Sequence, residues 1–334
     1  MWVSQRRGRV WRMPAAGGPA QLVLTAAVAR RYYVDDASKV DIAEEYSLSR
    51  FQVARLLDRA RASGLVKITI AAPGAIDVDL SSRLQRAYGL KHAVVVDTPE
   101  NDAAALRRDL GTAAAALLTE IVTANDVLGL AWSRSVSAMT NALTHLLPVP
   151  VVQLTGALAR ADVDDSSVDL VRGVGRRFGG PASFFYAPTI VPDASTASAL
   201  RRVPEVARTL RQFGSVTKAV VGVGLWAPTE STVYDATEED VRDALHSRGV
   251  RAEIAGALVD SAGHPVAAEL SERMICPSAD QLRAIPEVLA IAYNRVRSPA
   301  VKAAVRGGLV DSLVTHASLA RTLLEDAEDA QQLQ

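Results

Sequence analysis

The sequence of 334 residues contains little cysteine and no long hydrophobic run. Cys276 is the only cysteine, which excludes a disulfide within the chain and fits a reducing cytosol. Apolar stretches such as Gly111–Thr119 end at charges like Glu120, and none approaches the roughly 18–20 residues of a membrane helix. The arginines near the N-terminus precede no apolar signal-peptide core. These absences predict a cytoplasmic protein without a membrane segment.

The spacings of common metal and catalytic motifs are also absent. The histidines have no ligand spacing to each other or to Cys276, so no zinc site is expected. The sequence has no Walker loop for phosphate and no G-x-S-x-G nucleophile elbow. We therefore expect no metal and no cofactor.

Charge is unevenly distributed along a chain whose formal net charge is zero. Residues 1–70 carry 12 Lys and Arg against 6 Asp and Glu, whereas the remainder carries 25 against 31. The length suits two domains, and 49% hydrophobic with 22% charged residues is a globular composition. A basic head on an acidic body predicts that only the head binds a polyanion.

The segment Ser38–Ala62 has the pattern of a helix-turn-helix. Ile42 and Ala43 are apolar positions on a first helix, and Ser49 is a candidate N-cap of a second. Basic and amide side chains on the second helix suit the DNA major groove. The alternative is an amphipathic hairpin with a solvated basic face. The candidate DNA-binding residues are Ser38, Ser49, Arg50, Gln52, Val53, Arg55 and Arg59.

The segments on either side of this motif predict the domain boundaries. A helix over 21–33 and a strand over 65–70, after a glycine C-cap at Ser63-Gly64, predict a winged helix-turn-helix over 19–72. Residues 1–18 read as disordered, with Met13 as an alternative start and a minor-groove arm as the other interpretation. Residues 73–90 form a linker and an oligomerisation helix, in which Leu80, Leu84 and Tyr88 are expected to pair with a second chain.

Residues 91–330 alternate between apolar strands and helices. This alternation predicts an α/β effector domain with a mostly parallel sheet covered by helices. The expected strands are 92–97, 126–132, 149–154, 183–191, 218–224, 288–293 and 312–316, and 253–260 is expected to be a strand pair or a bent strand. The expected helices are 101–123, 135–147, 168–178, 197–213, 238–248, 279–285, 298–307 and 317–324.

The best candidate for a ligand site is the end of the strand near Trp132, where Ser133, Arg134 and Ser135 precede a helix. Open parallel sheets bind ligands at the carboxyl ends of strands, and a helix N-terminus with an arginine suits a phosphate. The alternative is an ordinary N-cap beside an exposed arginine.

Further candidates lie at other strand ends. Gln153 suits a sugar hydroxyl or a buried structural amide, and Gly222 and Gly224 permit close backbone approach to a ligand. Glu253 and Lys302 together suit hydroxyls and a phosphate, although each alone is also typical of a surface charge.

Several ordered blocks carry a family resemblance, among them DIAEEYSLSRFQVARLLDRARASGLVKI, GLAWSRSV, VVQLTGAL, EIAGALVDSAGHPV and SPAVKAAVRGGLVDSLVTHASLARTLL. From about Leu22 to Leu324 the chain resembles the SorC family (SorC/DeoR group) of bacterial sugar-responsive transcription regulators. The resemblance implies a winged helix-turn-helix and an effector domain related in fold to ribose-5-phosphate isomerases and glucosamine-phosphate deaminases. It also implies an oligomer (a dimer or tetramer) that binds operator DNA and a phosphorylated sugar or polyol.

The resemblance also assigns residues. Ser133, Arg134 and Ser135 fall on the family's phosphate loop, Glu253 on an acidic sugar contact and Lys302 on the family's lysine. This sequence departs from the family at Ser133 (usually glycine), Ser135 (threonine), Glu253 (aspartate), Asn294-Arg295 (near a usual glycine pair) and His316 (aspartate). Two rival hypotheses remain: a sugar-phosphate isomerase or deaminase with an accessory DNA-binding head, and a constitutive DNA-binding protein whose body only oligomerises.

Overall fold

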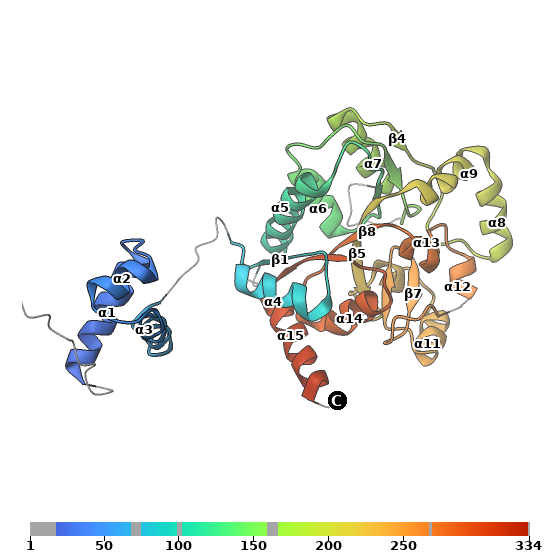
Figure 1. Cartoon of the computed structure of the whole chain (residues 1–334). Helices are drawn as coiled ribbons and strands as arrows, with labels where there is room; N and C mark the ends of the chain where they lie inside the picture. The colour runs from blue at the N-terminus through green and yellow to red at the C-terminus, as the bar shows by residue number, and fades with distance from the viewer. Residues whose placement is uncertain (1–17, 68–74, 99–101, 159–165, 267–268, 333–334) are drawn as a thin grey trace, which may run out of the picture. The chain divides into compact units, whose positions relative to one another are not determined.

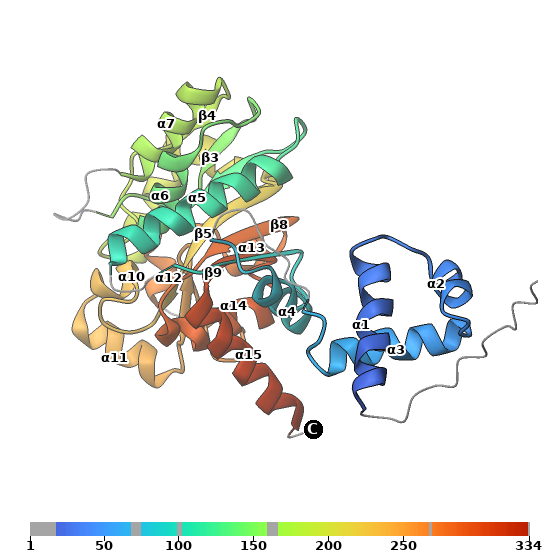
Figure 2. The same cartoon turned by 90° about the vertical axis from the view of Figure 1, so that its left-hand side faces the viewer.

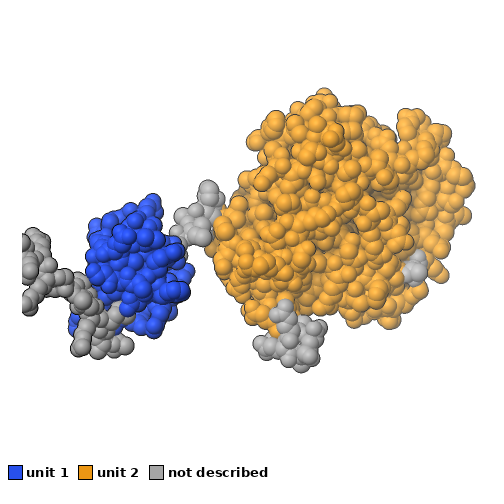
Figure 3. Space-filling model, in the orientation of Figure 1, with its two compact units in different colours: residues 1–71 blue, residues 72–334 orange. Residues whose placement is uncertain are grey.

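The computed structural model of the chain describes residues 18–67, 75–98, 102–158, 166–266 and 269–332. The chain divides into two compact units, residues 1–71 and residues 72–334 (Figure 3). The segment 1–17, which the sequence predicts to be disordered, lies outside the described residues.

Within residues 18–67, unit 1 has three helices around a small apolar core. They are α1 (Pro19–Tyr33), α2 (Lys39–Glu45) and α3 (Arg50–Ala62). Val28, Ile42, Val53 and Leu56 are at most 1% exposed and fill the space between the helices. The predicted helix-turn-helix is confirmed, because α2 and α3 pack on each other and on α1.

Both helices of the motif begin at a capping box. The Ser38 hydroxyl accepts a hydrogen bond from the Asp41 N–H, and the Ser49 hydroxyl accepts one from the Gln52 N–H. Helix α3 ends at Ala62 and is followed by Ser63 and by Gly64, which has a φ of +71° and confirms the glycine C-cap. Of the predicted wing strand, residues 65–67 form no strand and 68–70 lie outside the described residues, so the wing stays a prediction.

In the described part of unit 2, seven strands of the sheet run parallel, as the sequence predicts (Figure 1). Their order across the sheet is β1-β9-β8-β5-β2-β3-β4. The strands are β1 (His92–Val96), β2 (Leu128–Leu130), β3 (Val151–Gln153), β4 (Ala182–Ser183), β5 (Lys218–Leu225), β8 (Glu287–Ile291) and β9 (Ser312–His316). An antiparallel hairpin, β6 (Ala252–Ile254) and β7 (Ala257–Val259), pairs with the end of β5.

Helices cover both faces of this sheet (Figure 2). One face contacts α5 (Ala103–Ile121), α6 (Arg134–Ala142) and α7 (Ser167–Phe178). The other contacts α4 (Val78–Tyr88), α13 (Ala279–Arg283), α14 (Ser298–Arg306) and α15 (Ala317–Gln332). Along β5, Val220 faces the first group whereas Val221 faces the second, as the two-residue period of a strand requires.

The remaining elements are α8 (Ala194–Arg202), α9 (Pro204–Arg211), η1 (Gln212–Ser215), α10 (Thr232–Asp235), α11 (Glu239–Ser247), α12 (Glu269–Glu272) and η2 (Arg295–Arg297). Of these, η2 contacts β5, α14 and α15. Within the described part of the chain, no helix has the length and apolar character needed to cross a membrane.

The predicted strand over 183–191 is wrong beyond Ser183. Its backbone groups leave the sheet: the Phe185 N–H donates to the Gln153 side chain, and the Thr189 N–H donates to the Ala157 carbonyl. The predicted helix over 197–213 is interrupted between α8 and α9, because Pro204 lacks the N–H that a continuous helix requires.

The helix predicted to pair with a second chain packs instead within unit 2. Leu84 is fully buried and Leu80 is 6% exposed, both in the core shared with α15. The Tyr88 hydroxyl donates to the Leu323 carbonyl, and burial raises the pKa of this tyrosine to about 12. Leu80, Leu84 and Tyr88 therefore stabilise their own chain rather than a dimer interface.

We expect Leu84→Ala to lower the free energy of unfolding of unit 2 by about 2–5 kcal/mol, because it leaves a cavity in a closed core. Urea unfolding of the full chain measures this, with Val78→Ala on the exposed side of α4 as the matched control. A change in oligomeric state by sedimentation, without loss of stability, would restore the interface interpretation.

Candidate functional site

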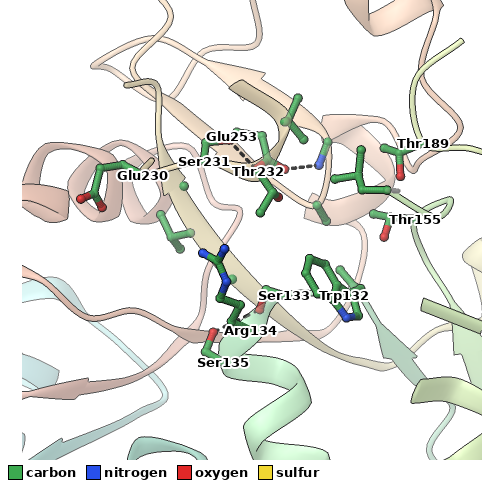
Figure 4. A pocket seen from close by; sticks show the side chains of 18 of the residues that line it. Trp132, Ser133, Arg134, Ser135, Thr155, Thr189, Glu230, Ser231, Thr232 and Glu253 are labelled. Carbon is green, nitrogen blue, oxygen red and sulfur yellow. Dashed lines mark hydrogen bonds between the residues drawn. The ribbon is translucent and has the colours of Figure 1, made fainter. Parts of the chain in front are cut away.

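A pocket opens at the carboxyl ends of β2, β3, β5 and β8 (Figure 4). Its walls come from segments far apart in the sequence, which the parallel sheet brings to one edge. They are Ala131–Ser135 after β2, Thr155–Gly156 and Leu158 after β3, Thr189 after β4, Gly222–Gly224 on β5, Thr229–Val233 after β5, Glu253 with Ala255–Gly256 in the hairpin, and Tyr293 with Arg297 after β8.

The N-terminus of α6 forms one wall, as the strand–turn–helix pattern predicts. Ser133 is the N-cap, and its hydroxyl accepts from the Val136 N–H at 3.1 Å. Ser135 is buried, with its hydroxyl 3.1 Å from that of Ser133 and 3.3 Å from the Ile291 carbonyl. The two hydroxyls therefore hold the loop against β8, and the partial positive charge of the helix end faces the pocket.

Arg134 is the cation of this wall. Figure 4 shows its side chain extending from the first turn of α6 into the pocket, toward the side that carries Ser231. Guanidinium groups and helix N-termini both stabilise anions. The structure thus brings together the three residues that the sequence singled out for an anion.

Glu253 lies on the opposite wall, on β6. Its Oε1 accepts from the Gly256 N–H at 2.6 Å, and its Oε2 accepts from the Ser231 hydroxyl at 3.2 Å. Burial raises the pKa of Glu253, although the hydrogen bonds and the positive charge of Arg297 oppose that change. A buried carboxyl group with a raised pKa retains its proton, so it can donate a hydrogen bond to one hydroxyl and accept a hydrogen bond from another.

Gly222 and Gly224 line the pocket for a reason the sequence did not reveal. A Cβ at Gly222 would lie 2.9 Å from the Ser133 hydroxyl oxygen, and one at Gly224 would lie 2.8 Å from the Ser231 Cβ. These glycines therefore allow both walls to approach β5 closely. Their role in the described structure is to position Ser133 and Ser231.

Sequence reasoning missed a polar cluster at the mouth of the pocket. Glu230 accepts from the Arg297 Nε at 2.7 Å and from the Asn294 Nδ2 at 3.0 Å. Arg297 also donates to the Val223 carbonyl and stacks 5.0 Å from the Tyr293 ring centre. Asn294 has a φ of +74°, which is the kind of backbone that glycine adopts readily. The family resemblance places a glycine pair near this position. The departure of Asn294-Arg295 from that pair was the sequence signal that could have revealed this cluster.

Gln153 does not line the pocket. Its side chain is fully buried, donates to the Thr155 carbonyl and the Ser167 hydroxyl, and accepts from the Phe185 N–H. The predicted sugar contact is therefore wrong, and the alternative of a structural amide is correct. The Gln153 side chain links β3 to α7 and to the segment that follows β4.

Lys302 also lies outside the pocket lining. It is on α14, and its Nζ donates to the Asp326 carboxylate on α15 at 2.8 Å. Arg297, five residues earlier, is the basic residue that this segment contributes to the pocket. The predicted contact of Lys302 with a ligand is not supported by this geometry.

The head presents most of its predicted DNA-binding residues to solvent. Arg50, Arg55 and Arg59 are exposed on α3, and Ser38 and Ser49 are the N-caps described above. Val53 is 0% exposed in the head core, so its assignment to DNA binding is wrong. Gln52 forms half of the Ser49 capping box.

A family model described as "Putative sugar-binding domain" matches residues 75–325, which include the whole pocket. The chain belongs to this family. The resemblance to the SorC family is also confirmed, and the relatives below share nearly the full length.

Two relatives and one solved structure illustrate the match. The transcriptional regulator LsrR of Klebsiella pneumoniae is 27% identical over 91% of this chain and 94% of its own. The deoxyribonucleoside regulator of Bacillus subtilis is 24% identical over 91% of this chain and 97% of its own. The crystal structure of the full-length sorbitol operon regulator SorC from Klebsiella pneumoniae superposes with a TM-score of 0.70 at 22% identity, covering 91% of this chain and 99% of that one.

The raised pKa of Glu253 predicts a specific pH dependence. The folded protein retains this proton at a pH where the unfolded chain loses it, near pH 4.5. The contribution of Glu253 to stability is therefore complete below pH 4.5 and is lost as the pH rises through the folded pKa. Glu253→Gln lacks this loss, so its free energy of unfolding should increase relative to wild type from pH 4.5 upward. Urea titrations at several pH values measure the difference, and a constant difference would contradict a protonated Glu253.

Proposed function

We propose that this protein is a transcription regulator whose binding to operator DNA is controlled by a phosphorylated sugar or polyol. The observation that carries the proposal is the pocket in which the α6 N-terminus and Arg134 face a buried carboxyl group, Glu253. One wall suits an anion and the other suits hydroxyls. The regulators of sugar and nucleoside operons among the relatives support the same assignment.

The phosphate is expected at the first turn of α6. Backbone N–H groups there point along the helix axis, and Arg134 adds a charge-assisted hydrogen bond. The sugar hydroxyls would then lie toward Glu253 and Ser231, whose side chains already share a hydrogen bond. Arg297 is ion-paired with Glu230, so its charge is balanced and it serves to shape the mouth of the pocket.

The DNA-binding end is the exposed side of α3. Arg50, Arg55 and Arg59 supply positive charge on a helix that follows a tight turn, the arrangement that enters the major groove. Because helix-turn-helix proteins bind paired half-sites, the active form is proposed to be a homo-oligomer, a dimer or a tetramer. The ligand would act by favouring one arrangement of that oligomer.

We propose binding rather than turnover of the sugar phosphate. Among the described residues, two carboxyl groups line the pocket: Glu230 is ion-paired with Arg297, and Glu253 is held by Ser231 and Gly256. No histidine is among the lining residues of the described pocket. Incubation with pentose phosphates and amino-sugar phosphates would detect an isomerase or deaminase by product formation.

We expect Arg134→Ala to weaken effector binding about tenfold or more, because it removes a charge-assisted hydrogen bond to the phosphate. A thermal-shift titration with a panel of sugar phosphates measures this loss as a smaller rise in melting temperature. Lys302→Gln is the matched control, since it removes a cation outside the pocket lining and should leave the ligand response intact. Wild-type behaviour of Arg134→Ala would exclude the α6 terminus as the phosphate site.

We expect Arg55→Ala to weaken DNA binding without changing the ligand-induced thermal shift. If Arg55 contacts a phosphate, affinity falls equally for all sequences and the slope of log K against log salt decreases by about 1. If Arg55 contacts a base, specificity relaxes at one position instead. Gel-shift titrations at several salt concentrations distinguish the two, and simultaneous loss of ligand response would contradict the division into two functional units.

A further inference from the structure

The solvent-facing side of α3 has an aromatic residue near its centre. The opposite side is buried through Val53, Leu56, Leu57 and Ala60. With about 100° of rotation per residue, the outer line of the helix runs through Phe51, Arg55 and Asp58. Phe51 is 84% exposed, more than any other large hydrophobic side chain in the described residues. A phenyl ring exposed on this line is available for contact with a molecule that the helix binds.

Phe51 also has a favourable position along the helix. It is the second residue of α3, within the first turn after the Ser49 cap. The N-terminal residues of a recognition helix are those that reach base edges in the major groove. If α3 lies in the major groove, a side chain at this point, centred on the outer face, would face the floor of the groove rather than the phosphate backbone.

Gln52, the neighbouring candidate for reading bases, is already committed to the helix cap. Its Oε1 accepts a hydrogen bond from the Ser49 N–H at 2.7 Å, while the Gln52 N–H donates to the Ser49 hydroxyl. A bidentate contact with adenine requires both the oxygen and the nitrogen of the amide. Gln52 cannot make that contact without opening the capping box, which leaves Phe51 as the central side chain of the first turn.

We propose that Phe51 determines operator specificity by packing against the C5-methyl group of a thymine in each half-site. The thymine methyl is the apolar group that base pairs present in the major groove, and phenylalanine is suited to contact it. Arg55, one turn along the same line, would contact the adjacent base or phosphate. This inference rests on the proposed function, because it requires that α3 binds operator DNA.

The experiment replaces thymines of the operator half-site one at a time with deoxyuridine, which removes the C5-methyl and retains every hydrogen-bonding group. The operator is first selected from random DNA with the full chain. At one thymine, wild-type affinity should fall about fourfold, the equivalent of about 0.8 kcal/mol for one buried methyl group. At that position Phe51→Ala should bind thymine and deoxyuridine operators equally.

Val23→Ala provides the matched control, because Val23 is 68% exposed on α1 of the same head. It should discriminate thymine from deoxyuridine as wild type does. Thermal unfolding of each variant confirms that the head remains folded, as expected for exposed positions.

The outcomes separate the inference from the function on which it rests. If the wild-type chain selects no DNA, the proposed function fails. If it selects an operator but no deoxyuridine changes affinity, or if Phe51→Ala still discriminates, the role of Phe51 fails while DNA binding stands. Equal loss for both operators with a changed sedimentation coefficient would place Phe51 at a contact between copies and would also overturn the inference.

Discussion

Strand β5 lies between β2 and β8 and runs parallel to both, with Val220 opposite Leu130 on one side and Leu289 on the other. The pocket depends on this register, because parallel strands end at the same edge of a sheet. The turn after β2 carries the α6 N-terminus, β5 carries Gly222 and Gly224, and the chain after β8 carries Arg297. The hairpin that holds Glu253 is itself paired with the last residues of β5. A one-residue shift of β5 would reverse which side chains face the two helix layers and would separate the walls.

The parts of this arrangement that follow from local sequence were predictable. The apolar runs identify the strands of the central sheet. Ser133–Ser135 mark a strand–turn–helix junction that can be recognised from the local sequence alone. Ser49, a predicted N-cap, similarly marks the start of the second helix of the helix-turn-helix. The sequence predicts that a ligand closely approaches the backbone at Gly222 and Gly224. That contact stays a prediction, because the folded chain places the Ser133 and Ser231 side chains against these glycines.

The parts that depend on long-range contacts were not predictable. Lys302 was assigned to the pocket, yet α15 places Asp326 beside it, and nothing in the sequence near Lys302 indicates that pairing. Gln153 is on β3, where a side chain turned to the interior meets Ser167 and the Phe185 backbone. Glu230 and Arg297 are separated by 67 residues and show no local pattern. In each case the position of the side chain is determined by a hydrogen-bond or ion-pair partner on another helix, strand or loop. Composition and local spacing do not identify that partner.

Residues 75–81, at the start of the described part of unit 2, are hydrogen-bonded to β1. This attachment constrains how a ligand can control DNA binding. The Asp77 N–H donates to the Val95 carbonyl, the Asp97 N–H donates to the Ala75 carbonyl, and the Ser81 hydroxyl accepts from the Val95 N–H. These bonds fix residues 75–81 to β1, at the edge of the sheet. Because β1 is joined to the pocket strands through β9 and β8, its position follows that of the whole sheet. In an oligomer, the points from which two heads extend would therefore be set by the placement of the two β1 edges. Half-sites require a defined separation, so the ligand would have to act on the arrangement of effector units, and only through unequal affinity for two such arrangements.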